Sequence, residues 1–275
     1  MDWESSPAYN AAMSFELRAP AGAWAMVTGA SSGFGAEYAK RLAALSYSLV
    51  LHGRDADRLQ ALADDLQAEH KCRVEILQAD LASDDGIAQA VQAADRSGLR
   101  ILVNNAGYGD PGLFQERDVE AFIAMQKVHN EAAVRLAHVA VRRMLEQGSG
   151  AVVNLASVAA WLPGRGSVMY YATKAFLNAF SRSLAADLHG TGVVVQSLCP
   201  GLTHTGFHDA GKPAYLDKSR TPRWLWMECD TVVDFSLRML GRGRVVQIPG
   251  VVNRIFAWVG GHDWLYRRLV GNVRK

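Results

Sequence analysis

Short apolar runs alternate with longer helical patterns along most of this chain, and this alternation constrains the fold more than any other feature. The runs are nearly continuous in apolar residues, which is typical of strands buried on both faces. Strands that alternate with helices predict a parallel sheet covered by helices on both sides. The predicted strands are 23–28, 48–52, 73–78, 101–104, 151–155, 193–198 and 244–248. The predicted helices are 35–45, 56–69, 84–97, 119–146, 168–188 and 231–240.

The amount of apolar sequence indicates one large α/β domain. Of the 275 residues, 49% are hydrophobic, which is enough to bury a sizeable core. We expect an N-terminal extension over 1–20, a nucleotide-binding catalytic domain over 21–250, and a basic and aromatic tail over 251–275. The formal net charge is only +2, so no strong basic field indicates nucleic acid as a partner. A small molecule is the expected partner.

The three cysteines, Cys72, Cys199 and Cys229, have no paired spacing, which argues against a disulfide framework and against a zinc site. Residues 1–19 lack the basic and apolar regions of a signal peptide. No stretch reaches the roughly 18 uninterrupted apolar residues that a membrane-spanning helix needs. These features predict a cytoplasmic protein without a metal.

A glycine-rich segment with the sequence TGASSGFG occupies residues 28–35, directly after the first predicted strand. Gly29, Gly33 and Gly35 let the backbone approach a pyrophosphate, and the helix that follows offers unpaired N–H groups and a favourable dipole. An ordinary glycine-rich turn is the alternative. No Gly-Lys-Ser/Thr follows, so the segment is not a Walker loop. The context therefore predicts a dinucleotide site.

Tyr170 and Lys174 are four residues apart, which puts both side chains on one face of a helix. A phenol is a weak acid near neutral pH, and a nearby cation lowers its pKa by stabilising the charged form. Ser157, thirteen residues before Tyr170, adds a hydroxyl. These groups can protonate and stabilise the oxygen of a carbonyl that receives a hydride. A solvated Tyr–Lys pair would show the same spacing, and Tyr171 is a local competitor that we expect to pack or to line the pocket.

These motifs occur together in the order found in the short-chain dehydrogenase/reductase family, and the chain resembles the single-domain branch of that family. The matching segments are residues 28–35, Asp80-Leu81, Asn104-Asn105-Ala106-Gly107, Ser157, Tyr170 with Lys174, and Pro200-Gly201 followed by Thr205. The resemblance implies a doubly wound Rossmann fold with a seven-stranded parallel sheet. It also implies that Tyr170 is the acid/base, that Lys174 holds the ribose and lowers the tyrosine pKa, and that Ser157 binds the substrate oxygen.

The resemblance implies further roles around a cofactor. Asp80 would reach the adenine, residues 104–107 would brace the sheet beside the cofactor, and residues 200–205 would lie near the nicotinamide. The implied cofactor contacts are Gly29, Ser31, Ser32, Gly33, Phe34, Gly35, Arg54, Asp80, Leu81, Asn105, Ala106, Gly107, Tyr170, Lys174, Pro200, Gly201, Thr203 and Thr205.

Cofactor choice is expected to depend on the end of the second strand, where an acidic residue binds a ribose 2′-hydroxyl and a basic one accepts a 2′-phosphate. Here Gly53 is followed by Arg54, whose guanidinium offers several donors to a phosphate. NADP(H) is therefore predicted. NAD is the alternative, because Asp55 is adjacent and Ser32 is neutral.

His129 departs from the family pattern. The active-site asparagine of the family falls on His129 when residues 134–136 of the long central helix are used for alignment, and Asn130 follows one position later. Either histidine replaces asparagine or the register shifts by one. A histidine could hold a water next to Lys174 and support a proton relay, so we include His129 among the predicted catalytic residues.

Two regions fall outside the alternation. Residues 203–228 form a long irregular connection of the kind that makes lids and binding loops. Residues 251–275 predict either a terminal helix packed on the domain or a second subunit, or an element at a membrane surface or over the substrate. Several apolar side chains flank the expected site and favour an apolar substrate, namely Trp161, Leu162, Phe207, Trp224 and Trp226.

The expected function is interconversion of a carbonyl and an alcohol by hydride transfer with NADP(H). Two rivals stay open. One is a cofactor-binding sensor or scaffold of the same fold, favoured only by His129, and the other is epimerisation or dehydration, disfavoured by the chain length and the glycine spacing. The resemblance also implies a homodimer or homotetramer that pairs through the helices predicted at 119–146 and 168–188, whose many alanines would permit close approach.

Overall fold

A seven-stranded parallel sheet forms the centre of the protein in the computed structural model, which describes residues 15–205, 221–242, 244–262 and 264. The strand order is β3-β2-β1-β4-β5-β6-β9, and every neighbouring pair is parallel. The strands are β1 (Trp24–Thr28), β2 (Ser48–Gly53), β3 (Val74–Gln78), β4 (Leu99–Asn104), β5 (Gly150–Leu155), β6 (Val193–Leu198) and β9 (Val246–Gln247). This order confirms the predicted doubly wound Rossmann fold.

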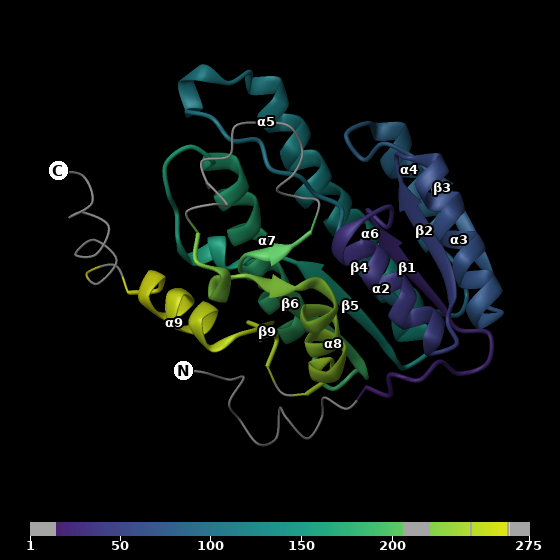
Figure 1. Cartoon of the computed structure of the whole chain (residues 1–275). Helices are drawn as coiled ribbons and strands as arrows, with labels where there is room; N and C mark the ends of the chain where they lie inside the picture. Colours follow the sequence, from purple (N-terminus) through teal and green to yellow (C-terminus); the bar gives the residue numbers. More distant parts are fainter. Residues whose placement is uncertain (1–14, 206–220, 243, 263, 265–275) are drawn as a thin grey trace.

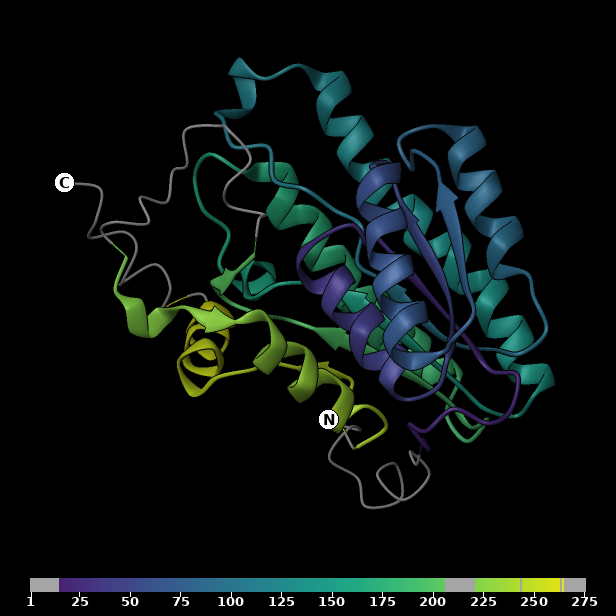
Figure 2. The same ribbon diagram turned by 45° about the vertical axis from the view of Figure 1, so that its right-hand side comes forward.

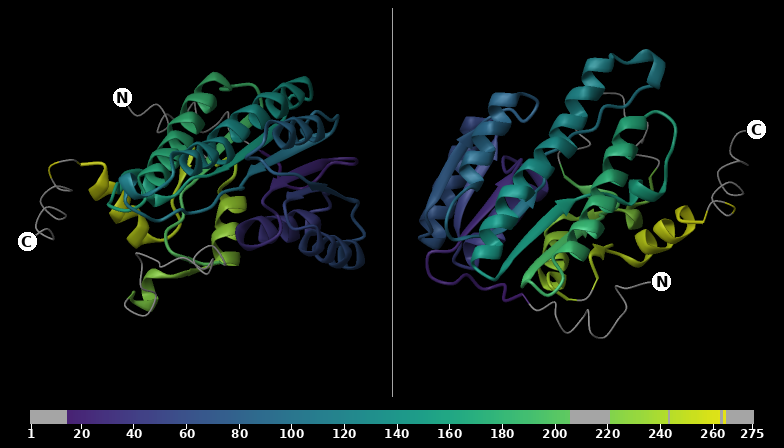
Figure 3. Two further views of the ribbon diagram at one scale, coloured as in Figure 1. Left: turned by 90° about the horizontal axis from the view of Figure 1, so that it is seen from above. Right: turned by 180° about the vertical axis from the view of Figure 1, so that it is seen from behind.

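Helices cover both faces of the sheet (Figure 1 and Figure 3). The helices on one face are α2 (Gly33–Ala44), α3 (Ala56–His70) and α8 (Cys229–Met239). The helices on the other face are α4 (Asp84–Ala94), α6 (Ala132–Glu146) and α7 (Val168–Asp187). Figure 2 brings α2 and α3 forward, where they lie side by side over the sheet.

The burial of the strands on both faces explains why they could be predicted from the sequence. In β5 and β6 all six residues are buried, so both faces of these strands require apolar or fully paired side chains. Met26 in β1 lies between Val50 in β2 and Leu102 in β4, and all three are buried. The strand order reverses around β1 and β4, and in open α/β sheets ligands bind beyond the carboxyl ends of the strands at such a point.

The prediction of one helix over 119–146 is wrong in one respect. The segment consists of α5 (Val119–Gln126), a π-helical turn η3 (Lys127–Glu131) and α6. A π-turn contains one extra residue per turn, which side-chain periodicity does not reveal, and such turns are frequent at functional sites. His129 lies in this turn.

The region predicted as irregular contains two short strands. β7 (Thr203–His204) pairs in parallel with β8 (Met227–Glu228), and a 3₁₀ turn, η7 (Arg223–Leu225), precedes β8. Phe207 lies outside the described residues. The predicted strand at 244–248 shortens to the two residues of β9, which pair with the end of β6 at the edge of the sheet.

A terminal helix, α9 (Val251–Gly260), follows β9 and packs on the 3₁₀ turn η4 (Val158–Trp161). This confirms the packed-helix prediction for the first part of the tail, while residues 265–275 lie outside the described part of the chain. Among the helices that the structure describes, none combines the length and the apolar character needed to cross a bilayer.

Candidate active site

The glycine-rich turn after β1 has a backbone and a close packing that favour glycine. Gly29 has a φ of 65°, and a Cβ there would lie 3.0 Å from both Ala106 Cα and Asn105 Nδ2. A Cβ at Gly35 would collide with the carbonyl oxygen of Gly29 and would lie 2.6 Å from Asn105 Nδ2. The turn therefore lies tightly against the segment that follows β4.

The start of α2 fits an anionic group. Ser32 is the N-cap residue, and its side chain makes no capping hydrogen bond to the first turn. The amides at this helix N-terminus can therefore donate to a phosphate, and the helix dipole favours the negative charge. Ser32 is exposed and Ser31 is partly exposed, whereas Phe34 packs against the core. These residues fit the pyrophosphate of a dinucleotide.

Thr28 and Asn105 join the turn to the end of β4. The Asn105 Nδ2 donates to the carbonyl oxygens of Thr28 at 2.8 Å and Gly29 at 3.0 Å. The Thr28 Oγ1 accepts from the amides of Asn105 at 2.9 Å and Ala106 at 3.0 Å. This is the bracing that the resemblance implied for residues 104–107.

His52, near the end of β2, is a positioning residue that the sequence analysis missed. Its Nδ1 accepts from the Gly29 amide at 3.4 Å, and its Nε2 lies 3.2 Å from the Ala79 carbonyl oxygen. Burial lowers the pKa of His52 to about 4, so the ring is neutral at physiological pH. The neutral ring accepts at Nδ1 and donates at Nε2, which fits both contacts. A histidine inside an apolar run was the available signal.

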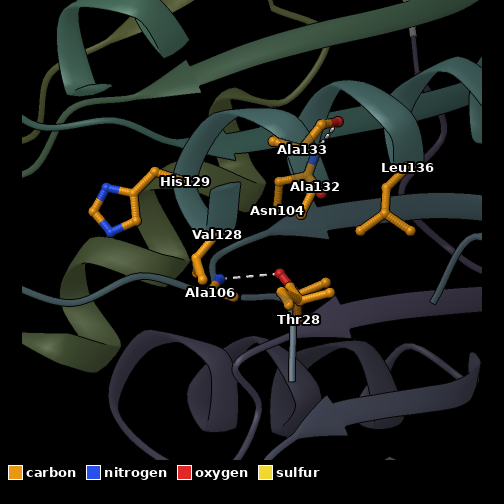
Figure 4. A pocket seen from close by; sticks show the side chains of 9 residues that line it. Thr28, Asn104, Ala106, Val128, His129, Ala132, Ala133 and Leu136 are labelled. Carbon is orange, nitrogen blue, oxygen red and sulfur yellow. Dashed lines mark hydrogen bonds between the residues drawn. The ribbon is translucent and has the colours of Figure 1, made fainter. Parts of the chain in front are cut away.

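A small cavity of about 10 Å³ lies under this junction, lined by Thr28, Asn104, Ala106 and His129 among others (Figure 4). Figure 4 also shows the hydrogen bond from the Ala106 amide to Thr28. The Asn104 Nδ2 donates to Asn154 and to the Ala133 carbonyl oxygen, but within the described chain its Oδ1 has no hydrogen-bond partner. The cavity has room for about one water molecule, which could donate to this oxygen.

Arg54 and Asp55, after the end of β2, have side chains in different environments. Asp55 caps α3, because its Oδ1 accepts from the Arg58 amide at 3.1 Å and its other oxygen pairs with the Arg58 guanidinium. The Arg54 side chain is exposed. Asp80, after β3, is also exposed and accepts from the Ala82 amide, while Leu81 is buried. Asp55 is therefore engaged in the helix cap, and Arg54 remains accessible from solvent.

Ser157, Tyr170 and Lys174 lie together beyond the end of β5. Ser157 is the N-cap of η4, and Tyr170 and Lys174 are in the first two turns of α7. A side-chain hydrogen bond joins Tyr170 to Ser157. The Lys174 Nζ donates to the Leu155 carbonyl oxygen at 2.6 Å and lies 5.7 Å from the centroid of the Tyr170 ring. The spacing in the sequence thus places a hydroxyl, a phenol and an amine in one cluster.

The pKa of Tyr170 shifts in the direction opposite to the one expected. Desolvation raises the pKa of Tyr170 to about 12, and the hydrogen bond from Ser157 only partly opposes this rise. The pKa of Tyr170 is therefore raised and not lowered, because burial dominates. Burial also lowers the pKa of Lys174 to about 8, so its amine is mostly cationic at neutral pH.

His129, rather than Asn130, lies beside Tyr170. Its ring is 6.2 Å from the Tyr170 ring, in an edge arrangement. Its Nε2 accepts from the Tyr108 amide at 2.9 Å, so Nδ1 carries the proton and donates to the Thr173 Oγ1 at 2.9 Å. Thr173 in turn donates to the Tyr170 carbonyl oxygen at 3.0 Å. Both ring nitrogens are therefore occupied by protein groups.

This network corrects the proposed relay role. A histidine that carries protons needs a ring nitrogen facing water, and His129 is 2% exposed with both nitrogens engaged. Burial, followed by the positive charge of Lys174, lowers the pKa of His129 well below its usual range. The expected neutral form is thus confirmed in direction, but the geometry is that of a clasp between the loop after β4 and α7.

The remaining predicted residues surround this cluster. Thr205 lies against the glycine turn, since a Cβ at Gly33 would be 3.3 Å from its Cβ. The Pro200 carbonyl oxygen accepts from the Val158 amide and lies 3.5 Å from Ser157 Oγ. Thr203 is buried. Gly201 lies against the side chain of Asn253 from α9, a contact that the sequence did not indicate.

The aromatic residues that were expected around the site divide into two groups. The Tyr171 ring is 6.3 Å from the Tyr170 ring, and its hydroxyl lies 3.0 Å from the Cβ position of Gly164. Trp161 and Leu162 are partly buried at the end of η4. In contrast, Trp224 is 68% exposed, and its neighbour Trp226 stacks on His204 at 5.0 Å. Trp224 is thus a surface side chain.

Comparisons with known proteins found a matching family model and similar sequences. The family model described as "short chain dehydrogenase" matches residues 23–214. The sulfoacetaldehyde reductase of Chromohalobacter salexigens is 39% identical over 185 residues, which cover 66% of this chain and 72% of that protein.

Two solved structures are similar over most of their length. A short-chain dehydrogenase from Sphingobium yanoikuyae in complex with NADPH has 34% identity and a TM-score of 0.78, covering 92% of this chain and 96% of that one. A bulky-bulky ketone specific alcohol dehydrogenase from Comamonas testosteroni has 30% identity and a TM-score of 0.74, with coverages of 92% and 95%.

Proposed function

The chain belongs to the short-chain dehydrogenase family, and from this premise we propose that it is an NADP(H)-dependent oxidoreductase that interconverts apolar ketones and alcohols at Ser157, Tyr170 and Lys174. The observation that carries this proposal is the cluster of these three side chains beyond the end of β5. The relatives of this chain are named as reductases and dehydrogenases, which favours a catalytic role over a sensor role.

Each group of the cluster has a chemical role in carbonyl reduction. A reduced nicotinamide would supply the hydride when bound. Tyr170 is protonated at neutral pH, because its pKa is about 12, so it can donate a proton to the substrate oxygen. Ser157 can donate a hydrogen bond to the same oxygen as negative charge develops there. Lys174, largely cationic, stabilises the tyrosinate that results and keeps N–H donors for a ribose hydroxyl.

Arg54 and Asp55 support NADP(H) as the cofactor. An acidic residue at this place would exclude a 2′-phosphate, but the Asp55 carboxylate is already bound to the α3 N-terminus and to Arg58. The exposed Arg54 guanidinium can pair with the phosphate through several N–H groups. The similar Sphingobium structure was obtained with NADPH.

An apolar substrate is supported by the side chains next to the cluster. Tyr171, Trp161 and Leu162 offer mainly apolar surface. On the loop after β4, the Arg117 guanidinium is paired with the buried Asp110 carboxylate, so it is not available to an anionic substrate. The Comamonas relative is described as a bulky-bulky ketone specific alcohol dehydrogenase, whereas the Chromohalobacter relative is named a sulfoacetaldehyde reductase.

Steady-state turnover with both cofactors tests this function. We expect consumption of NADPH with aryl and alkyl ketones, and weaker activity with sulfoacetaldehyde. Arg54→Ala should raise the KM for NADPH by roughly tenfold to a hundredfold and leave that for NADH unchanged, because a charged hydrogen bond to the 2′-phosphate is lost. Arg73→Ala, at an exposed arginine before β3, is the control. Equal KM values for the two cofactors in the wild type would contradict the cofactor proposal.

A further inference from the structure

Helix α9 turns an apolar face to solvent. Val251, Ile255 and Trp258 lie one turn apart and are 62%, 53% and 59% exposed. Asn253 and Ala257 lie on the other side of the helix and are buried against the domain. A surface helix normally shows the reverse pattern, with polar side chains outward. We call Val251, Ile255 and Trp258 the α9 apolar face; the His262 ring lies 4.6 Å from the Trp258 ring, which nevertheless stays 59% exposed.

The chain around and after this face is basic. Residues 251–275 contain five basic side chains and one acidic side chain, which gives a formal charge of +4. The whole chain carries +2, so the other 250 residues carry −2. The basic residues are Arg254, Arg267, Arg268, Arg274 and Lys275. Positive charge is therefore concentrated in the same short segment as the exposed apolar side chains.

We propose that α9 docks the protein, through its apolar face, onto a membrane surface that contains anionic lipids. The α9 apolar face enters the boundary between headgroups and acyl chains, and the basic side chains attract the lipid phosphates. Trp258 and Trp264, at 59% and 65% exposure, are of the residue type that prefers this boundary. With ten residues, α9 is too short to span the bilayer and lies in its surface plane.

A second copy of the chain is the other possible occupant of an exposed apolar face. A symmetric contact would have to pair two copies of a sequence segment, residues 251–275, that carries a formal charge of +4, and like charges repel. Anionic headgroups complement that charge instead. The combination of apolar stripe, tryptophans and basic tail therefore favours a lipid surface.

The packed side of α9 connects the docking surface to the candidate site. Asn253 lies against Gly201, and Gly260 lies against the backbone of Trp161 in η4, the turn that begins after Ser157. Figure 1 shows α9 beyond β9, at the margin of the molecule. Docking through α9 would place the lipid surface near η4, where an apolar ketone could be taken up; this last step rests on the proposed function.

Vesicle cosedimentation of the full chain tests the docking. The probes are vesicles of phosphatidylcholine alone and of phosphatidylcholine mixed with phosphatidylglycerol. The wild type should bind the mixed vesicles, with binding that weakens as salt rises. Ile255→Ser/Trp258→Ser and Arg267→Glu/Arg268→Glu should each lower the partition coefficient by roughly tenfold or more. The matched controls Leu145→Ser, on exposed α6 surface, and Lys71→Glu, after α3, should bind as the wild type does.

Turnover of a water-soluble ketone with NADPH separates this proposal from the proposed function, because neither double variant alters the cluster around Tyr170. Binding that fails in the wild type, or that persists unchanged in both double variants, overturns the docking proposal even if turnover is normal. Light scattering gives a further outcome. If Ile255→Ser/Trp258→Ser reduces the particle mass while no variant binds vesicles, the α9 apolar face is a contact between copies of the chain, and the lipid proposal is wrong.

Discussion

His129 joins three separate segments of the site through one neutral ring. It accepts from the Tyr108 amide, donates to Thr173 and packs edge-on against Tyr170. Because Thr173 also bonds the Tyr170 carbonyl oxygen, the position of the phenol depends on this ring. An asparagine amide can likewise donate and accept, which explains how the two residue types can occupy one place in related sequences.

Substitution of His129 tests the clasp. His129→Leu leaves the Tyr108 amide without its acceptor, at a cost of about 1–3 kcal/mol, and removes the bond that Thr173 accepts, although the Thr173 hydroxyl still donates to the Tyr170 carbonyl oxygen. We expect a fall in Tm and roughly a tenfold or larger fall in kcat for His129→Leu. His129→Asn should keep kcat within about tenfold, since an amide can replace part of the clasp. Thermal unfolding and steady-state kinetics measure both effects. Equal loss of kcat in the two variants would argue for a chemical role of the imidazole.

Low pH should destabilise the protein through its buried histidines. The folded pKa of His52 is about 4, below the ordinary 6.5, so the folded state holds the neutral ring while the unfolded chain takes up a proton below pH 6.5. The stabilisation is therefore complete above pH 6.5 and is lost as the pH falls toward 4, at up to about 1.4 kcal/mol per pH unit. Urea unfolding at pH 7.5 and 5.5 measures the slope. His52→Gln should flatten it, and an unchanged slope would contradict the assignment.

At the scale of elements, the glycine turn and the start of α2 form one rigid unit with the segment after β4. Gly35→Ala inserts a Cβ against the Gly29 carbonyl oxygen and the Asn105 amide, so the turn must move. Overpacking of this kind costs about 1–3 kcal/mol. We expect a lower Tm and a weaker affinity for NADPH, measured by differential scanning fluorimetry and fluorescence titration. Gly261→Ala is the control, because Gly261 has a φ of −73° and its Cβ position makes only ordinary contacts, the nearest at 3.4 Å. Unchanged NADPH affinity in Gly35→Ala would contradict the proposed pyrophosphate site.

The sequence alone was sufficient to predict the elements whose residues follow a simple pattern of hydrophobicity or spacing. Strands such as β5 and β6 are buried on both faces and therefore appear as apolar runs, and the Tyr170 to Lys174 spacing fixes a common helix face. The π-turn at 127–131 could not be predicted, because its extra residue changes the backbone hydrogen bonds and not the residue types. β7 and β8 have two residues each and depend on pairing across more than twenty residues of chain.

Contacts between distant segments account for the residues that were missed. His52 binds the backbone of Gly29 and Ala79, and the partners of His129 come from positions 108 and 173. Nothing local in the sequence pairs these positions. Burial likewise determines the direction in which the pKa of Tyr170 shifts. The spacing to Lys174 alone predicted a lower pKa, whereas burial raises it.

At the scale of the whole molecule, α5 and α7 present a face suited to self-association. Ile123 and Phe176 are 52% and 43% exposed, and Ala172, Ala175 and Ala179 of α7 face solvent. The alanines of α6, expected at the same contact, are buried in the core instead. We predict a dimer or tetramer at micromolar concentration, and dissociation of Phe176→Asp but not of Leu145→Asp, as measured by light scattering. A stable wild-type monomer would contradict this prediction.

The proposed function depends most on Tyr170 as the proton donor of an NADPH-dependent reduction. The direct measurement is kcat for ketone reduction by the wild type, Tyr170→Phe and Tyr171→Phe, together with NADPH binding by the same preparations. Tyr170→Phe should lower kcat by a factor on the order of 10² to 10⁴ with unchanged NADPH affinity, because only the acidic hydroxyl is lost. Tyr171→Phe should stay close to the wild type. Near-normal turnover in Tyr170→Phe, with the loss appearing in Tyr171→Phe, would contradict the central claim.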